Sequence, residues 1–238
     1  MLAIYKKELR SYFTSATGYV FIAAFLAVSG FLFSMFTMQY ATSGQDADLG
    51  TYFTCLMFMF SILVPLLTMK IFSEERKLKT EQLLLTSPVS LGSMVGAKFL
   101  AAYTMFAGTF LLSCLDYYVL FKYGKPTGGI IFGYTVAMLL LGAAFVAIGV
   151  FVSSLTENQL TAAVGTIAIL MFMLMINFLN NYIDFTPVRL VLNWLSIYSR
   201  FYNFTYGIFD FAALVYYTSI TVVFLFLTVR VYEKRRWE

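Results

Sequence analysis

Residues 126–156 read PTGGIIFGYTVAMLLLGAAFVAIGVFVSSLT, an unbroken run without Asp, Glu, Lys or Arg. A helix needs roughly 20 apolar residues to cross the hydrocarbon core of a bilayer, so this run is long enough. A lone strand is excluded because its unpaired backbone groups would find no water in lipid. The apolar residues also do not alternate, as they would in a membrane barrel. The run therefore predicts a transmembrane helix.

Five more apolar runs lie along the chain and predict an all-α transmembrane fold with six spans in a single domain, residues 1–238. Hydrophobic residues make up 61% of the chain and charged residues 12%, against about 25% charged residues in soluble domains. With a mean hydropathy of +0.81, the chain has too little polar surface to face water on all sides. The predicted spans are residues 19–40, 49–69, 99–121, 131–155, 160–181 and 211–230.

The distribution of Lys and Arg predicts the orientation of the spans. With the N terminus inside, the inner segments hold twelve basic residues and the outer segments hold four. Inner loops of membrane proteins carry the excess of Lys and Arg, so this orientation is favoured. An even number of spans then places both termini in the cytoplasm.

Two segments outside the spans are expected to lie in the membrane interface. Residues 1–14 form an amphipathic helix with apolar positions on one face and basic positions mostly opposite, as in helices that lie along a bilayer surface. Residues 184–210 hold apolar and aromatic positions that predict short helices half-sunk in the outer interface. The positions in residues 1–14 are Leu2, Tyr5, Leu9 and Tyr12 on one face and Lys6, Lys7 and Arg10 on the other.

Residues 70–98 form the one sizeable inner loop, and their pattern is typical of a surface that binds another protein. A run of polar, mostly charged residues comes first, and a leucine ridge, Leu83–Leu85, follows it. Thr80 can cap a short helix with Glu81 in its first turn, where an acid favours the positive helix end. A leucine ridge with charges around it suits a docking element, but basic residues in a plain loop would grip anionic lipid, and the residues alone leave both readings open. The candidate docking residues are Glu74, Glu75, Arg76, Lys77, Lys79, Thr80, Glu81, Leu83, Leu84, Ser87 and Pro88.

The chain shows no sign of a catalytic or metal site of its own. It has no histidine, and its two cysteines, Cys55 and Cys114, both lie in apolar runs. A P-loop needs Gly-x-x-x-x-Gly-Lys-Ser/Thr, so that backbone amides can cradle phosphates. The nearest match, at 124–127, lacks the upstream glycine and has a proline between its Lys and Thr. We therefore expect no catalytic residue, metal or cofactor in this chain, and no nucleic-acid partner.

Five residues inside the spans are candidates for a transport path or its gate. Asp116 is the one acid well inside an apolar run, where a mid-membrane carboxylate costs about 2.5–3.5 kcal/mol on insertion scales. Asp116 lies toward the outer end of its span, so contact with outer-leaflet water is the alternative. The adaptable side chains of Met57, Phe60, Met171 and Met175 could line an apolar path, or could contact lipid.

Three charged residues mark the inner boundary of the spans. Lys70 and Lys98 lie where a long side chain can snorkel to the interface, and a role in coupling is the alternative. Glu157 stands alone in the turn between spans four and five, where it can simply be solvated.

The inner loop resembles a stretch of the type-2 ABC exporter permeases. The interfacial N-terminal helix, the six spans, the outer segment and the basic C-terminal tail fit the same family, so the resemblance covers essentially the whole chain. Residues 195–210 and the C-terminal Glu-Lys-Arg-Arg-Trp resemble the gliding-motility (GldF-like) permease group. The residues that carry the family resemblance are Glu74-Glu75-Arg76, Thr80-Glu81, Leu84, Ser87-Pro88-Val89-Ser90 and Lys98.

This resemblance implies a permease in a bacterial cytoplasmic membrane that is not itself an enzyme. It implies a pair of permeases, this chain with a second copy or a paralogue, and a cytoplasmic ABC ATPase under each. ATP and Mg would be bound by the partner ATPase. The 72–90 loop would carry the coupling helix that enters a groove on the ATPase, and Glu157 would make a second, smaller cytoplasmic contact.

The expected function is ATP-driven export, in which this subunit supplies the path through the membrane. The alternative is a non-transporting membrane anchor that transmits ATPase motion to an extracytoplasmic auxiliary protein. An ion-coupled secondary transporter is disfavoured, because such proteins usually keep several acids or histidines at mid-membrane and often show inverted repeats. The shortage of charge in the spans argues against a path for highly charged solutes.

Overall fold

A computed structural model of the chain describes residues 1–38, 49–82, 89–123, 128–180, 186–202, 204 and 210–237. These residues are almost entirely helical and include no strand. Six stretches are long and apolar enough to cross a membrane, which confirms the predicted all-α fold with six spans. The elements are α1 (Leu2–Thr14), α2 (Ala16–Phe33), the π-helix η1 (Ser34–Met38), α4 (Leu49–Thr68), α5 (Lys70–Lys77), α7 (Leu91–Ser113), α8 (Asp116–Tyr123), α9 (Gly128–Leu155), α10 (Gln159–Leu179), α11 (Thr186–Leu195), α12 (Ile197–Tyr202) and α13 (Phe211–Trp237).

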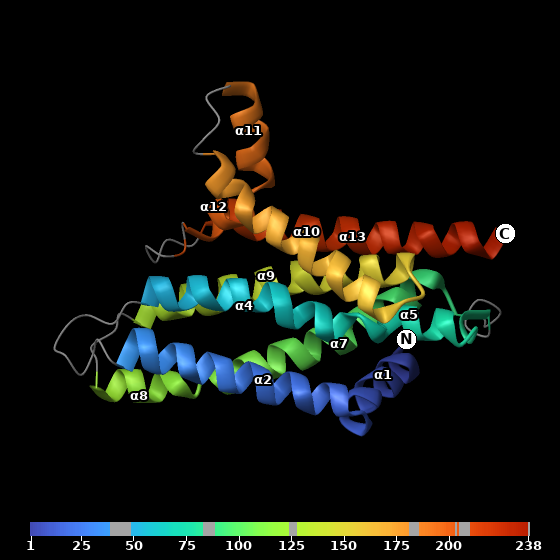
Figure 1. Cartoon of the computed structure of the whole chain (residues 1–238), viewed down its shortest axis with the longest axis horizontal. Coiled ribbons are helices and arrows are strands. Elements are labelled where there is room, and N and C mark those ends of the chain that lie inside the picture. Colours follow the sequence, from blue (N-terminus) through green and yellow to red (C-terminus); the bar gives the residue numbers. More distant parts are fainter. Residues whose placement is uncertain are drawn as a thin grey trace.

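The long helices lie side by side along the longest axis of the molecule, and both termini lie at the same end of the bundle (Figure 1). We call this the terminal end, and it also carries α1 and α5. The opposite end, which we call the far end, carries α8. Two termini at one end are what six crossings require, because each crossing takes the chain to the other side.

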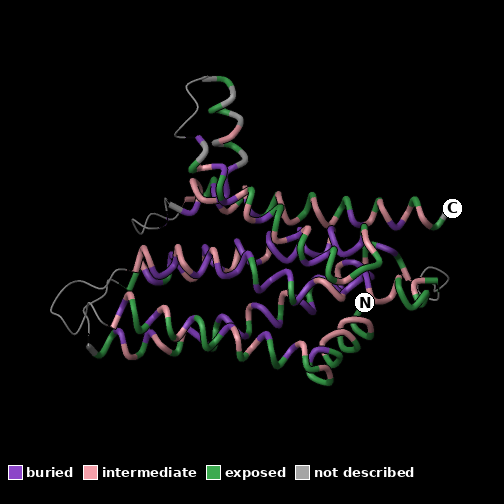
Figure 2. Tube along the Cα trace, in the orientation of Figure 1, coloured by how far each residue is buried: buried purple, intermediate pink, exposed green. Residues whose placement is uncertain are grey.

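The centre of the bundle is built around α9, which packs against α4, α7, α10 and α13. The spans α4 and α9 are the most buried, whereas α2 and α13 leave most of their surface open (Figure 2). Glycines let neighbouring helices approach α9 closely. A Cβ at Gly142 would lie 1.9 Å from Cε1 of Phe106, and a Cβ at Gly149 would lie 2.2 Å from Oγ1 of Thr68. Small residues allow such close packing between membrane helices.

Aromatic side chains fill the middle of the bundle. Phe25, Phe60, Phe106 and Phe110, from three different helices, are all completely buried. The ring of Phe60 lies 5.4 Å from that of Phe25, 4.9 Å from that of Phe106 and 5.9 Å from that of Phe110. Ring pairs at these separations attract each other beyond the burial of their area. We call these four residues the phenylalanine core.

The described part of the inner loop expected between spans two and three, residues 70–82 and 89–98, is largely helical. The helix α5 follows α4 with only Met69 between them, and α7 begins at Leu91 instead of near residue 99. Lys98, the charge that marked the predicted boundary, therefore lies within α7 and is buried inside the bundle. Toward the far end of the bundle, α7 ends at Ser113, and Asp116 begins a separate helix, α8.

Candidate functional site

The helix α5 ends in a sharp turn that exposes the residues after it. The N–H of Thr80 donates to the carbonyl of Glu75 at 3.0 Å, and that of Lys79 donates to the carbonyl of Arg76 at 3.1 Å. With a φ of 57° at Lys79, this is a Schellman ending with a lysine where glycine or asparagine is usual. The side chains of residues 77–80 are all exposed. We call residues 77–80 the exposed segment.

The predicted docking helix begins beyond this turn. The hydroxyl of Thr80 donates back to the carbonyl of Glu75 at 3.3 Å, so it closes α5. Residues 81–82 are helical. The predictions for Leu83, Leu84, Ser87 and Pro88 lie outside the residues that the structure describes.

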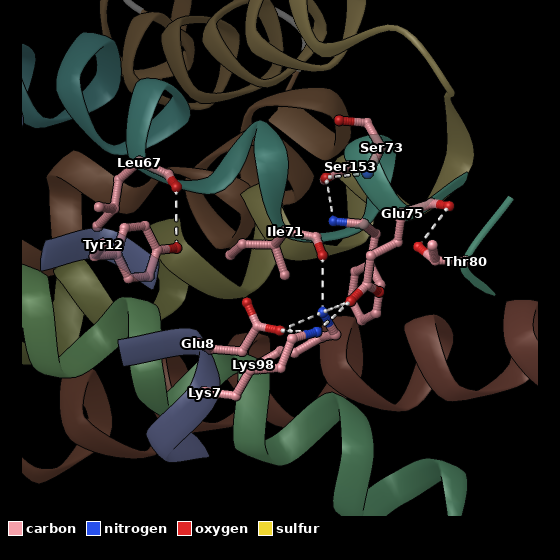
Figure 3. A network of polar contacts seen from close by, with 11 residues as sticks. Lys7, Glu8, Tyr12, Leu67, Ile71, Ser73, Glu75, Thr80, Lys98 and Ser153 are labelled. Carbon is pink, nitrogen blue, oxygen red and sulfur yellow. Dashed lines mark hydrogen bonds and ion pairs between the residues drawn. The ribbon is translucent and has the colours of Figure 1, made fainter. Parts of the chain in front are cut away.

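Lys98 is the centre of a buried ion cluster between three helices (Figure 3). Its side chain is only 1% exposed, and Nζ lies 2.8 Å from Oε1 of Glu75 and 3.0 Å from Oε1 of Glu8. Nζ also donates to the carbonyl of Ile71 at 3.0 Å. A buried charge is costly unless it is paired and hydrogen-bonded, and Lys98 is both. The prediction that Lys98 snorkels to the interface is therefore wrong.

The ion cluster ties the N-terminal helix to the rest of the bundle. Lys7 lies 3.6 Å from Glu8 and 3.5 Å from Glu75, although its side chain is 67% exposed. One turn along α1, the hydroxyl of Tyr12 donates to the carbonyl of Leu67 at 3.1 Å. Burial, with a smaller contribution from the charge of Glu8, raises the pKa of Tyr12, so the phenol keeps this proton. The apolar face predicted for residues 1–14 thus packs on protein through Tyr12. We call Lys7, Glu8, Glu75 and Lys98 the Lys98 cluster.

Ser153 joins the start of α5 to the end of α9. Its hydroxyl accepts hydrogen bonds from the N–H groups of Phe72 at 3.1 Å and Ser73 at 3.3 Å, and donates to the carbonyl of Met69 at 3.1 Å. The first N–H groups of a helix have no partner within the helix, so they need such an acceptor. Ser153 therefore holds α5 through backbone atoms of α5 and Met69, and this contact does not depend on the side chains of α5.

Two arginines hold the last carbonyls of α9. Arg76 donates to the carbonyl of Leu155 at 2.8 Å, and its Nε lies 3.0 Å from Oε1 of Glu157. Arg235 donates to the carbonyl of Ser154 at 2.6 Å, and its Nη1 lies 3.3 Å from Oε1 of Glu81. These carbonyls lack partners inside the helix, and cations are favourable at a helix C-terminus. We call this arrangement the α9 cap.

The arrangement joins a six-span bundle to a polar network at the end that carries both termini. A family model described as ABC-2 family transporter protein matches residues 2–237, nearly the whole chain. The chain belongs to the ABC-2 family. Members of this family are membrane-embedded permease components of ABC transporters, so the chain is a multi-pass membrane protein of that kind. The match is to the family as a whole and leaves the resemblance to the gliding-motility group a prediction, and no curated protein matches the chain.

In this ABC-2 protein the predicted docking residues fall into two sets. Glu75, Arg76, Glu81 and Glu157 make ion pairs that hold the 70–82 region to the bundle. Lys77, Lys79 and Thr80 belong to the exposed segment, and the side chain of Glu74 is partly exposed. The charges of the family-like stretch are thus divided between internal contacts and a surface that another protein can reach.

Sequence reasoning missed the residues that complete the network: Glu8, Ser153 and Arg235. Glu8 and Arg235 lie in charge-rich terminal segments, where nothing distinguishes them from neighbours that face solvent. Ser153 is one hydroxyl at the end of a long apolar run. Lys98 could be recognised as unusual, since it is a single charge within an apolar stretch. The sequence did not show which residues it pairs with.

The five residues proposed for a path or gate occupy three different environments. Met57 and Phe60 are completely buried in α4, and Phe60 belongs to the phenylalanine core. Met171 and Met175 lie on α10, where Met175 is 54% exposed. Asp116 lies in the first turn of α8, at the far end.

Proposed function

We propose that this ABC-2 protein is the membrane-spanning subunit of an ATP-driven exporter, and that a separate cytoplasmic ATPase docks at the terminal end. The observation that carries this proposal is the double character of residues 70–82. One side is held to the bundle by the Lys98 cluster and the α9 cap, and the other side presents the exposed segment. A docking element needs both features, because it must contact a partner and move the helices behind it.

The network provides a route from the docking element to the spans. A displacement of α5 pulls on α7 through Lys98, on α9 through Ser153 and Arg76, and on α1 through Lys7. Removing one partner of a buried ion pair costs about 3–5 kcal/mol. Because separating the paired helices would break such contacts, these helices move more readily together than apart. ATP and Mg would be bound by the partner, and the purified chain alone is expected to hydrolyse no ATP.

The proposal places the subunit in a membrane and in an assembly with a second permease. Both termini would be cytoplasmic, in the inner membrane of a bacterium. The open surfaces of α2 and α13 are apolar and leave room for lipid and for a second copy or a paralogue. In a variant with Cys55 and Cys114 replaced, Lys122→Cys should react with a membrane-impermeant thiol reagent from outside, and Lys234→Cys should not. If Lys234→Cys reacted and Lys122→Cys did not, the orientation would be the opposite of the one proposed.

The docking proposal is tested on the exposed segment, away from the internal ion pairs, and separately on the leucine ridge of residues 83–85. Lys77→Glu with Lys79→Glu, and separately Leu84→Ala, should release the ATPase or uncouple its hydrolysis from transport. Truncating a leucine at the centre of an interface can cost about 2 kcal/mol or more. Lys122→Glu, a charge reversal at the far end, is the control. The measurements are ATPase co-purification and substrate-stimulated hydrolysis. Wild-type values for both test variants would show that the ATPase docks elsewhere.

A second candidate function is a membrane anchor that transmits ATPase motion to an extracytoplasmic protein. The helix α11 favours it, because it stands away from the bundle (Figure 1) and exposes Leu190 by 59% and Trp194 by 71%. An adjacent reading frame for a large extracytoplasmic protein would support this function. Trp194→Ala should then release that protein without loss of ATPase binding, whereas a pure exporter should show no such partner.

A further inference from the structure

The last two turns of α13 extend past the predicted end of the sixth span, near residue 230, and pack against α5. Tyr232 is only 2% exposed, and its ring lies 4.9 Å from that of Phe72 in α5. The guanidinium of Arg235 lies over the ring of Tyr232, 5.3 Å from its centre. The C-terminal helix therefore contacts α5 near its start through a buried aromatic pair.

Arg235 adds a second contact, to the end of α9 and to the chain that follows α5. Its guanidinium donates to the carbonyl of Ser154 at 2.6 Å and lies 3.3 Å from the carboxylate of Glu81, which is 154 residues away along the chain. The side chains of Arg235 and Glu81 are only 19% and 13% exposed. A planar guanidinium has several N–H donors in a fixed fork, so it can serve a carbonyl and a carboxylate together.

These contacts place the exposed segment between two fixed points. On one side, Glu75 is held by Lys98 inside the bundle. On the other side, Glu81 is held by Arg235. Without Arg235, the exposed segment would keep its attachment through α5 but would lose the ion pair at Glu81, beyond the turn at Lys79.

We propose that Arg235 is a positioning residue, and that the C-terminal turns of α13 hold residues 77–82 in the orientation in which the ATPase binds them. This inference rests on the proposed docking function. It gives the basic C-terminal tail a role in coupling through one particular arginine. The neighbouring cations, Lys234 and Arg236, are exposed, so general attraction of the tail to anionic lipid would depend on them as much as on Arg235.

The first test needs no ATPase. A spin label is attached at Lys79→Cys in the full chain, with Cys55 and Cys114 replaced, and its mobility is measured in detergent by electron paramagnetic resonance. Arg235→Ala should make the label markedly more mobile, because Glu81 loses its partner. Arg236→Ala removes the same charge from an exposed position and should leave the spectrum unchanged. Equal spectra for the two variants would overturn the inference.

The second test uses the complex with the ATPase. Arg235→Ala should weaken ATPase binding roughly tenfold, the size expected when a hydrogen bond to a charged group is lost. Arg235→Lys should lie between Arg235→Ala and wild type, since it keeps the charge without the fork. Arg235→Glu combined with Glu81→Arg should recover part of the affinity that each single reversal loses, which a role of Arg235 that does not involve Glu81 does not predict.

The two tests separate the failure of this inference from failure of the docking proposal. If the wild-type chain binds no ATPase, the docking proposal fails, and the spin-label result still decides whether Arg235 orders the exposed segment. If Arg235→Ala mobilises the label but ATPase affinity stays at the wild-type value, Arg235 orders the segment without positioning it for the partner, and the inference is overturned.

Discussion

The phenylalanine core and the terminal end hold the bundle together by different means. In the core, completely buried rings of Phe25, Phe60 and Phe106 pack across α2, α4 and α7 without a charge among them. At the terminal end, Lys98 and Arg235 join elements far apart in the sequence through ion pairs and backbone carbonyls.

The two regions therefore determine different things: one determines which helices are neighbours, and the other determines where α5 lies. Packing between apolar helices is non-directional and depends on shape, since lipid tails are as apolar as the side chains they would replace. Ion pairs and hydrogen bonds depend on particular atoms at particular distances. The core therefore determines the bundle, and the terminal end determines the position and orientation of the exposed segment. The predictions that follow test this division.

The largest effect is expected for Gly142→Leu, which puts a side chain where α9 meets Phe106. A Cβ alone would lie 1.9 Å from that ring, so the helices must separate. Overpacking typically costs about 1–3 kcal/mol, and this site should reach or exceed the upper end because the ring is enclosed. We expect loss of monodisperse protein in detergent, measured by size-exclusion chromatography.

Gly108→Leu is the matched control for Gly142→Leu, because a Cβ at Gly108 meets nothing within 4 Å. It should elute as wild type does. Equal behaviour of the two variants would show that α9 does not approach α7 as closely as the structure has it.

Lys98→Met should destabilise the protein by about 3 kcal/mol, because Glu8 and Glu75 then lose their buried cation and keep only Lys7, which is 67% exposed. Adding Glu8→Gln and Glu75→Gln should recover much of the loss, since neutral amides replace the unpaired carboxylates. The measurement is thermal unfolding in detergent, and Lys70→Met is the control at the same end of the bundle. A loss that the triple variant does not relieve would mean that packing, and not charge, fixes this site.

Ser153→Ala should cost about 1–2 kcal/mol, because the buried N–H groups of Phe72 and Ser73 lose their shared acceptor. Its neighbour Ser154 is equally buried, but its hydroxyl donates to the carbonyl of Phe151 within its own helix. Ser154→Ala should therefore cost clearly less. Hydrogen exchange at α5 should rise for Ser153→Ala alone, and a rise of equal size in both variants would contradict the assigned role.

Glu233→Ala should have the smallest effect, under about 0.5 kcal/mol, because surface ion pairs contribute little. Glu233 lies only 2.6 Å from Arg230, closer than Lys98 lies to Glu75, but the two side chains are 61% and 41% exposed. Thermal unfolding within error of wild type is expected. A loss as large as that of Lys98→Met would show that distance, and not burial, sets the strength of these pairs.

Much of the fold could be predicted because the bilayer sets the length of each span. The predicted run at residues 160–181, for example, differs little from α10. The candidate site was predicted only as a region. The residues of 74–81 were recognised as a group, but the group mixes partners of the bundle, such as Glu75, with exposed residues, such as Lys77. Side chains three or four positions apart on a short helix look alike in sequence until the surface that each one faces is known.

The amino-acid sequence by itself determined that the chain has six helical spans, because apolar length and the lack of charge suffice for crossing a membrane. It also determined that a charged segment lies between the second and third spans. Only the tertiary structure decided the partners of those charges. Lys98 meets Glu8 across 90 residues, and Arg235 meets Glu81 across 154. Such pairs depend on how the helices are placed around α9, and that placement comes from packing of the whole bundle, which no local pattern of residues contains.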